Sequence, residues 1–205
     1  QLVVYTIVFS FILKTNIERY YLYLFVALIP WIFFSSSITV GSASIVAQKD
    51  LIKKIYFPRM VIPISYVTSS FVNMLLCFIV IFAVIIVSGA GINFLALLTL
   101  PVIMLVEYIL ALGMAMLTSA ITVYFRDLEH ILGIVTMAWM YMTPIMYDKS
   151  IVPENLMPIF NLNPMTHVIE CYRAVLYEKK IPDLTTLLSA AGLGILILIV
   201  GILVF

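Results

Sequence analysis

The chain consists of long apolar runs that charged and polar residues interrupt at only a few places. Hydrophobic residues make up 64% of its 205 residues and charged residues 10%, whereas soluble domains carry about 25% charged residues. A run of roughly 20 apolar residues is long enough to cross the hydrocarbon core of a bilayer as a helix. The composition therefore predicts an all-α, polytopic membrane protein with little room for a soluble catalytic domain.

Six apolar runs predict six transmembrane helices within one domain, residues 1–205. Their expected bounds are 1–13, 20–47, 61–88, 94–124, 128–147 and 184–205. The first run is too short to cross and begins without an initiating methionine, which predicts that residues before it are missing. Because it leads directly into further spans, a secretory signal peptide is not favoured.

A cluster of cations predicts the orientation. Lys49, Lys53, Lys54 and Arg59 lie in the short loop between spans two and three, opposed only by Asp50. Such loops face the cytoplasm, which places residues 125–127 inside and residues 14–19, 89–93 and 148–183 outside. The total of Lys and Arg, five inside and six outside, does not favour this orientation, so the local density of cations decides it.

The same loop predicts a short amphipathic helix. Leu51, Ile52, Ile55 and Tyr56 recur at helical spacing, and Pro58 discourages continuation of the helix. One interpretation is an interfacial helix resting on lipid headgroups. The other is a docking surface for a cytoplasmic partner.

A tight second turn joins spans four and five. Asp127 is expected to cap the fifth helix, and Glu129 lies in its first turn, where the helix dipole favours an anion. Pro144 is expected to kink or end that helix. Capping accounts for the acidic residues but leaves Arg126 without a role.

The outer segment predicts two short helices. Asn163 and Pro164 fit an N-cap followed by proline at the first helical position. A second helix is expected over residues 153–160. Both are too short to span, which predicts a re-entrant hairpin in the outer leaflet beside a pore or cleft. The longer helix has one apolar stripe, with Thr166, Glu170 and Arg173 expected on other faces; the stripe comprises Met165, Val168, Ile169, Tyr172 and Leu176.

Several of these segments together resemble a known family. They are residues 27–34 (ALIPWIFF), residues 51–58 (LIKKIYFP), residues 124–127 (YFRD), and Asn163-Pro164 followed by Tyr172-Arg173. In this order and spacing they are similar to the membrane subunit of ABC-2 type polysaccharide exporters, the group of O-antigen, capsule and teichoic-acid permeases. The resemblance covers nearly the whole chain.

The resemblance implies a six-span permease in the cytoplasmic (inner) membrane of a prokaryote, working as a homodimer with two ATPase subunits. Its substrate would be a lipid-linked polysaccharide. The family also carries an interface helix before its first span, which would precede Gln1. The residues implied in coupling to the ATPase are Leu51, Ile52, Lys53, Lys54, Tyr56, Phe57, Arg126 and Asp127. Those implied in an outer gate are Asn163, Pro164, Tyr172 and Arg173.

Energy would have to come from a partner. The sequence contains no GxxxxGK[ST] phosphate loop, so ATP and Mg²⁺ are expected on a separate subunit and no cofactor on this chain. The cysteines and histidines lack the spacing of a metal site, and a net charge of +1 indicates no nucleic-acid partner.

Aromatic side chains are candidates for the translocation path, because rings with polar edges suit sugars. The candidates are Tyr5, Phe9, Trp139, Tyr141 and Tyr147. The alternative is that they form interfacial belts or fill contacts between helices.

Glu107 is the one carboxylate well inside a predicted span, and a hydrogen bond to a neighbouring helix is favoured over a transport role.

Small residues four positions apart predict close helix packing, at Ala111, Ala115 and Ser119 and at Ala190 and Gly194.

Two other functions remain as alternatives: an ABC-2 permease for a small hydrophobic drug or lipid, and a membrane-embedded enzyme that modifies lipids or glycans. The enzyme would need a cluster of His, Asp or Glu at the membrane face, and only scattered residues occur. The sequence therefore favours a transporter permease and not an enzyme.

Overall fold

The computed structural model describes residues 19–54, 56–89, 91 and 93–205. All regular structure in these residues is helical, which confirms the all-α class. The predicted first span, residues 1–13, lies outside the described residues together with the path candidates Tyr5 and Phe9.

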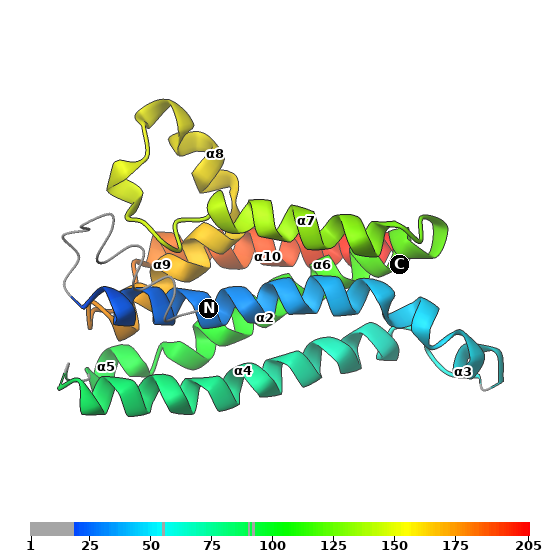
Figure 1. Cartoon of the computed structure of the whole chain (residues 1–205), viewed down its shortest axis with the longest axis horizontal. Helices are drawn as coiled ribbons and strands as arrows, with labels where there is room; N and C mark the ends of the chain where they lie inside the picture. Colours follow the sequence, from blue (N-terminus) through cyan, green and yellow to red (C-terminus); the bar gives the residue numbers. More distant parts are fainter. Residues whose placement is uncertain (1–18, 55, 90, 92) are drawn as a thin grey trace.

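Four helical segments are long and apolar enough to cross a membrane. They are α2 (Tyr20–Ala47), α4 (Val61–Val87), the segment Phe94–Tyr124 and α10 (Leu184–Val204). The segment Phe94–Tyr124 contains the short α5 (Phe94–Leu97) and the long α6 (Leu100–Tyr124). These four match the second, third, fourth and sixth predicted spans, and they run along one common axis (Figure 1).

The predicted fifth span, 128–147, is shorter in the structure. Helix α7 (Leu128–Tyr141) has 14 residues, about 21 Å of rise, which falls short of the roughly 30 Å hydrocarbon core. The chain then turns at residues 142–147. Pro144 accounts for this end, since proline lacks an N–H and the residue before it disfavours the helical conformation.

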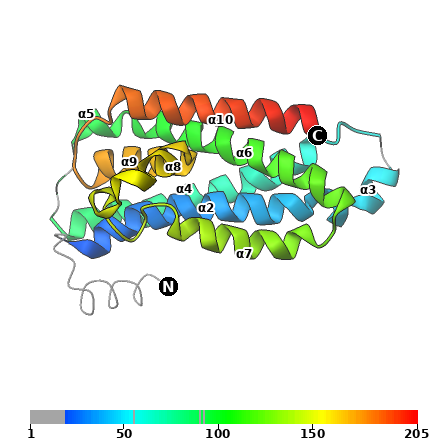
Figure 2. The same cartoon turned by 90° about the horizontal axis from the view of Figure 1, so that it is seen from above.

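Helix α6 is the centre of the bundle. It packs against α10 on one side and α2 on the other, as Figure 2 shows. Helix α2 also contacts α4 and α7, and it is buried along most of its length. Short helices mark the two ends of the bundle, α9 (Pro164–Leu176) at one and α3 (Lys49–Lys54) at the other (Figure 1). We call these the α9 end and the α3 end.

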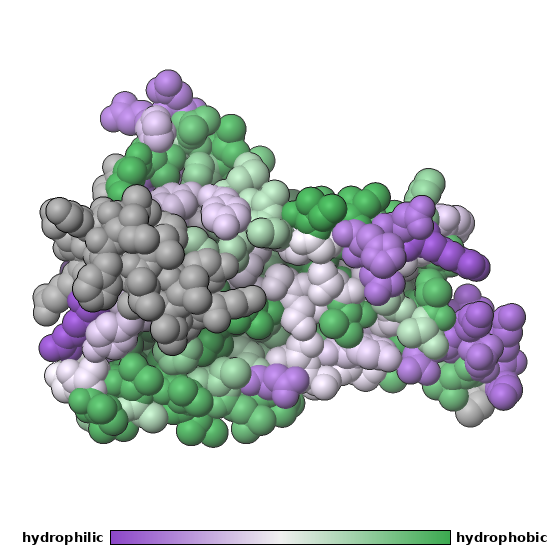
Figure 3. Space-filling model, in the orientation of Figure 1, coloured by the Kyte–Doolittle hydropathy of each residue, from purple (hydrophilic) through white to green (hydrophobic). Residues whose placement is uncertain are grey.

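The surface matches a bundle that lies in lipid. Helices α4 and α10 expose most of their apolar side chains. Hydrophilic residues gather instead at the α3 end and at the tip of the 148–162 segment (Figure 3). This distribution leaves an apolar belt between polar regions, as a membrane requires.

The central helices approach one another at small residues. A methyl group at Gly41 would lie 2.7 Å from Ala115 Cβ, so α2 and α6 nearly touch there. A methyl group at Gly113 would lie 2.6 Å from the backbone N and Cα of Leu198 in α10, and one at Gly201 would meet the Gly113 carbonyl. The prediction is confirmed at Ala115 and at Gly194, where a methyl group would lie 3.5 Å from Leu110 Cβ of α6. Gly41, Gly113 and Gly201 are contact points that the sequence analysis did not name.

We expect Gly113→Ala to lower the free energy of unfolding by about 1–3 kcal/mol, because the added methyl group has no room between two backbones. The measurement is thermal unfolding of the purified protein in detergent. Gly192→Ala in α10 is the matched control, since no atom lies within 4 Å of its added methyl group. Equal melting temperatures for the two variants would contradict the close contact.

Candidate functional site

Helix α9 begins as the sequence predicts. Asn163 Oδ1 accepts a hydrogen bond from the Met165 backbone N–H at 3.1 Å, and Pro164 occupies the first turn. The Asn163 amide also donates to Thr143 Oγ1 at 2.9 Å, which ties the start of α9 to the turn after α7. Asn163 therefore has a local and a tertiary role.

Helix α9 is buried on more faces than expected. The whole predicted apolar stripe is buried, from Met165 to Leu176. Thr166 and Arg173, expected on other faces, are also buried, with 0% and 6% of their surface exposed. The reason is tertiary, because α9 packs against α2, α6 and α10 at once.

Three consecutive backbone carbonyls after α7 are each bound by a side chain. The chain leaves the helix at Tyr141, so the carbonyls of residues 145–147 have no helical donor. We call this segment the carbonyl turn. The donors are Arg173 Nη2 to Ile145 O at 2.7 Å, Tyr20 Oη to Met146 O at 2.8 Å, and Tyr23 Oη to Tyr147 O at 3.1 Å.

Arg173 joins α9 to α2 as well as to the carbonyl turn. Its guanidinium carbon lies 3.7 Å from the centre of the Tyr23 ring, a cation–π contact worth about 2 kcal/mol when desolvated. Burial lowers the pKa of the Arg173 guanidinium, whereas Tyr23, Asp148 and Glu170 act in the opposite direction. Arginine nevertheless keeps its charge in proteins, so this is a buried cation.

Tyr172 joins α9 to α6. Its hydroxyl donates to Glu107 Oε2 at 2.6 Å, and both side chains are completely buried. Burial raises the pKa of the Tyr172 phenol well above its usual value, and Glu107 acts in the same direction, so the phenol keeps its proton and donates. The expected hydrogen bond between Glu107 and a neighbouring helix is thus confirmed, with Glu107 as the acceptor. Among the described residues, Glu107 Oε1 has no hydrogen-bond partner.

The segment between the carbonyl turn and α9 stands away from the bundle (Figure 1). It contains two 3₁₀ turns, Lys149–Ile151 and Glu154–Leu156, and α8 (Met157–Leu162). The helix expected over 153–160 is therefore present with shifted bounds. None of the α8 side chains is buried, and a re-entrant position for this segment stays a prediction.

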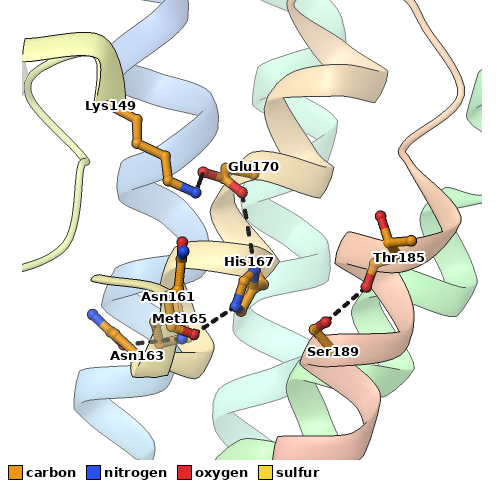
Figure 4. A network of polar contacts seen from close by, with 8 residues as sticks. All are labelled: Lys149, Asn161, Asn163, Met165, His167, Glu170, Thr185 and Ser189. Atoms are coloured by element: carbon orange, nitrogen blue, oxygen red, sulfur yellow. Dashed lines mark hydrogen bonds and ion pairs between the residues drawn. The ribbon is translucent and has the colours of Figure 1, made fainter. Parts of the chain in front are cut away.

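Polar contacts connect residues 148–162 to α9 (Figure 4). Lys149 Nζ lies 2.8 Å from Glu170 Oε1, and His167 Nε2 lies 2.8 Å from the Asn161 carbonyl. Beside these contacts is a cleft of about 300 Å³ between α2, α9 and the start of α10. Its charged lining residues are Asp148, Lys149, Glu170, Arg173, Glu178 and Asp183.

At the α3 end the predicted amphipathic helix is shorter than expected. Helix α3 ends at Lys54, and Tyr56 and Phe57 follow outside it. Pro58 keeps Phe57 out of the helix, because proline disfavours the helical conformation of the residue before it; nothing in the structure explains the end at Lys54. Helix α3 buries no side chain, and Tyr56 is fully exposed. Leu51, Ile52, Lys53 and Lys54 lie on the helix as expected.

The turn between α6 and α7, also at the α3 end, lacks the side-chain cap that the sequence predicts. Arg126 and Asp127 are exposed between α6 and α7, and Asp127 holds the N-cap position, but its side chain makes no capping bond. Its backbone is helical (φ −72°, ψ −9°), whereas a capping side chain needs an extended backbone. The expected side-chain cap is therefore wrong.

The aromatic path candidates in the described residues lie in different surroundings. Trp139 packs against two rings of α2, at 6.4 Å from Trp31 and 5.3 Å from Phe34 between ring centres. Tyr141 is exposed, and its carbonyl accepts from the Tyr147 hydroxyl at 2.8 Å. Trp139 fits the alternative of helix packing, and a role of these residues in the path stays a prediction.

Sequence reasoning missed Tyr20 and Tyr23, which hold the carbonyl turn. A signal for them exists in the sequence. They are three positions apart at the start of a span and therefore share one helix face. Pro144 predicts free carbonyls after α7, but only the folded chain brings the donors to them.

We expect Asn163→Ala to lower the free energy of unfolding by about 2 kcal/mol, because it removes both the helix cap and the bond to Thr143. Thr143→Val removes only the bond between the side chains and should cost about 1 kcal/mol. Thermal unfolding in detergent measures both. Equal stability of the two variants would show that the Asn163 cap contributes nothing to the free energy of unfolding.

The comparisons with known proteins agree with this architecture. The model of the ABC-2 type transporter family matches residues 1–177. An O-antigen export system permease protein RfbA of Myxococcus xanthus is 30% identical over 97% of this chain and 76% of its own length. A protein of the same name from Klebsiella pneumoniae is 31% identical over 98% of this chain and 78% of its own length. The chain therefore belongs to the ABC-2 type transporter family and is a transporter membrane domain.

Proposed function

We propose that this chain is the permease subunit of an ATP-driven exporter that moves a lipid-linked polysaccharide across the cytoplasmic membrane of a prokaryote. The observation that carries the proposal is the match to two O-antigen export permeases over nearly the whole chain and about three quarters of theirs. The architecture supports it, since the apolar bundle has polar regions at both ends.

The α3 end would face the cytoplasm and dock the ATPase. Four cations lie in or beside α3, which exposes its side chains and contacts no other part of the bundle closely enough to bury them. An exposed, positively charged helix of this kind can bind a partner protein without refolding. The exposed Arg126 and Asp127 lie at the same end of the bundle.

The permease would work as a homodimer with two ATPase subunits. A translocation path for a glycan needs polar or aromatic walls on more than one side, and one chain exposes mainly apolar side chains on α4 and α10. The second copy would supply the opposite wall, with membrane lipid around both. Tyr141 ends α7 and Tyr147 lies in the carbonyl turn after it, where such a path would leave the membrane.

The α9 end would act as the outer gate. Helix α9 is too short to span, and it is held by the polar contacts of Asn163, Tyr172 and Arg173. Polar contacts at an interface can be exchanged for others when the packed elements shift against one another. Opening would move α9 away from the carbonyl turn.

Charge reversal tests the docking surface. We expect Lys53→Glu with Lys54→Glu to abolish co-purification of the ATPase and to abolish export, because the cations would face the ATPase. The matched control is Lys179→Glu with Lys180→Glu, two exposed lysines beyond α9 at the opposite end. Undiminished co-purification and export in the first double variant would refute docking at α3.

A reversible cross-link tests the gate. Thr143 and Asn163 are hydrogen-bonded across the join between α7 and α9, so cysteines there can be joined by a short, reducible thiol cross-linker. In a background without Cys77 and Cys171, we expect the cross-link to stop export and reductant to restore it. The single-cysteine variants are the controls. Export that continues with the cross-link confirmed in place would rule out the gate.

A further inference from the structure

Two neighbouring residues of α9 are bonded to two different helices. Tyr172 donates to Glu107 of α6, whereas Arg173 stacks on Tyr23 of α2 and donates to the carbonyl turn. The hydrogen bonds of α9 hold these two residues at a fixed spacing. Helix α9 therefore bridges α2 and α6 at the α9 end of the bundle.

Helices α2 and α6 run in the same direction, from the α9 end towards the α3 end (Figure 1). They touch most closely at Gly41 and Ala115. Along the helices, Tyr23 lies about 27 Å from Gly41, and Glu107 lies about 12 Å from Ala115. A tilt about the Gly41–Ala115 contact would therefore separate the two bonded side chains much more than it would move the contact itself.

If α2 and α6 separate at the α9 end, α9 cannot follow both, and one bond must break. The bond between Tyr172 and Glu107 and the contacts of Arg173 differ in the surroundings that each side chain would have after breaking. Glu107 and Tyr172 are both fully buried, and neither lines the charged cleft. Buried polar groups left without partners cost about 1–3 kcal/mol each, so this bond resists opening.

Arg173 has a different alternative. It lines the cleft of about 300 Å³, together with Glu170, Glu178 and Asp183. A guanidinium released from Tyr23 and the carbonyl turn could therefore meet carboxylates and water there. Glu170 and Glu178 already pair with Lys149 and Lys180, and the Ile145 carbonyl loses its donor. New charge-assisted bonds to the acidic lining therefore offset part of the cost of breaking the Arg173 contacts, whereas the bond between Tyr172 and Glu107 has no such replacement.

From this asymmetry we infer that Tyr172 and Arg173 are positioning residues with opposite tasks: Tyr172 keeps α9 attached to α6 throughout transport, and Arg173 is the contact that releases α2 and the carbonyl turn. Helix α9 then moves with α6 when the gate opens. The inference rests on the proposed function, in which the ATPase drives α2 and α6 from the α3 end.

Cys171 provides a reporter for this movement. It lies beside Tyr172, lines the same cleft and is buried. Burial raises the pKa of its thiol to about 12, so the thiolate that reacts with maleimides is scarce in the closed arrangement. Widening of the cleft would hydrate the thiol and speed its reaction.

The experiment uses the complete exporter with its ATPase in proteoliposomes, in a Cys77→Ser background. It measures ATP hydrolysis, export, and labelling of Cys171 by a water-soluble maleimide with and without ATP. We expect ATP to speed labelling about tenfold in the parent protein, as a coupling of roughly 1.4 kcal/mol between the two ends would produce. In Tyr172→Phe we expect hydrolysis to persist while the export per ATP and the ATP-dependence of labelling fall about tenfold.

Two variants separate positioning from a loss of folding. Glu107→Gln keeps an oxygen that accepts from Tyr172 and should retain the ATP-dependence of labelling. Tyr108→Phe, the matched control, removes the hydroxyl of the next residue on α6, which is hydrogen-bonded to Thr68 of α4 and not to α9. A merely structural role for Tyr172 would lower hydrolysis and export together.

The outcomes are distinguishable. If Tyr172→Phe leaves the ATP-dependent labelling and the export per ATP unchanged, the inference is overturned. The same holds if the parent protein exports polysaccharide without any ATP-dependent labelling of Cys171. If the parent complex hydrolyses ATP and changes its labelling but moves no polysaccharide, the proposed substrate is wrong and the α9 movement stands.

Discussion

Carbonyl oxygens that a broken helix cannot satisfy organise the α9 end of this protein. Helix α7 ends at Tyr141, ahead of Pro144, and the residues that follow, Ile145 and Met146, are buried, so their carbonyls need donors from the protein. Tyr20, Tyr23 and Arg173 supply one donor to each of three consecutive carbonyls. Satisfying this short turn thus requires α2, α7 and α9 to meet at one place, and the rest of the α9 end is arranged around that junction.

The junction brings a buried cation, Arg173 of α9, close to a buried carboxyl, Glu107 of α6, which the neighbouring Tyr172 holds. Arg173 and Glu107 do not pair with each other; each is held by a different aromatic residue, Tyr23 and Tyr172. Buried ionisable groups are costly unless their hydrogen bonds are satisfied. Ionisable residues in such positions inside a membrane protein usually serve function, and here they connect the candidate gate helix to α2 and α6, two of the helices that reach the α3 end.

Much of the fold could be predicted from the residues. Hydrophobic run lengths identified α2, α4, α6 and α10, because the bilayer demands about 20 apolar residues per span. Asn163 and Pro164 identified the start of α9, because capping and a proline at the first position are local effects. The length of α7, the end of α3 at Lys54 and the uncapped Asp127 were harder, since helix ends depend on small differences in backbone conformation.

Run lengths and local motifs of the sequence determined an all-helical membrane domain and where most of its helices begin. These properties follow from residues close together in the chain. The tertiary structure alone decided that Tyr172 bonds to Glu107, 65 residues away, and that Arg173 reaches the carbonyl of Ile145, 28 residues away. A hydrogen bond depends on distances of a few tenths of an ångström, and only the packing of α9 against α2 and α6 sets those distances.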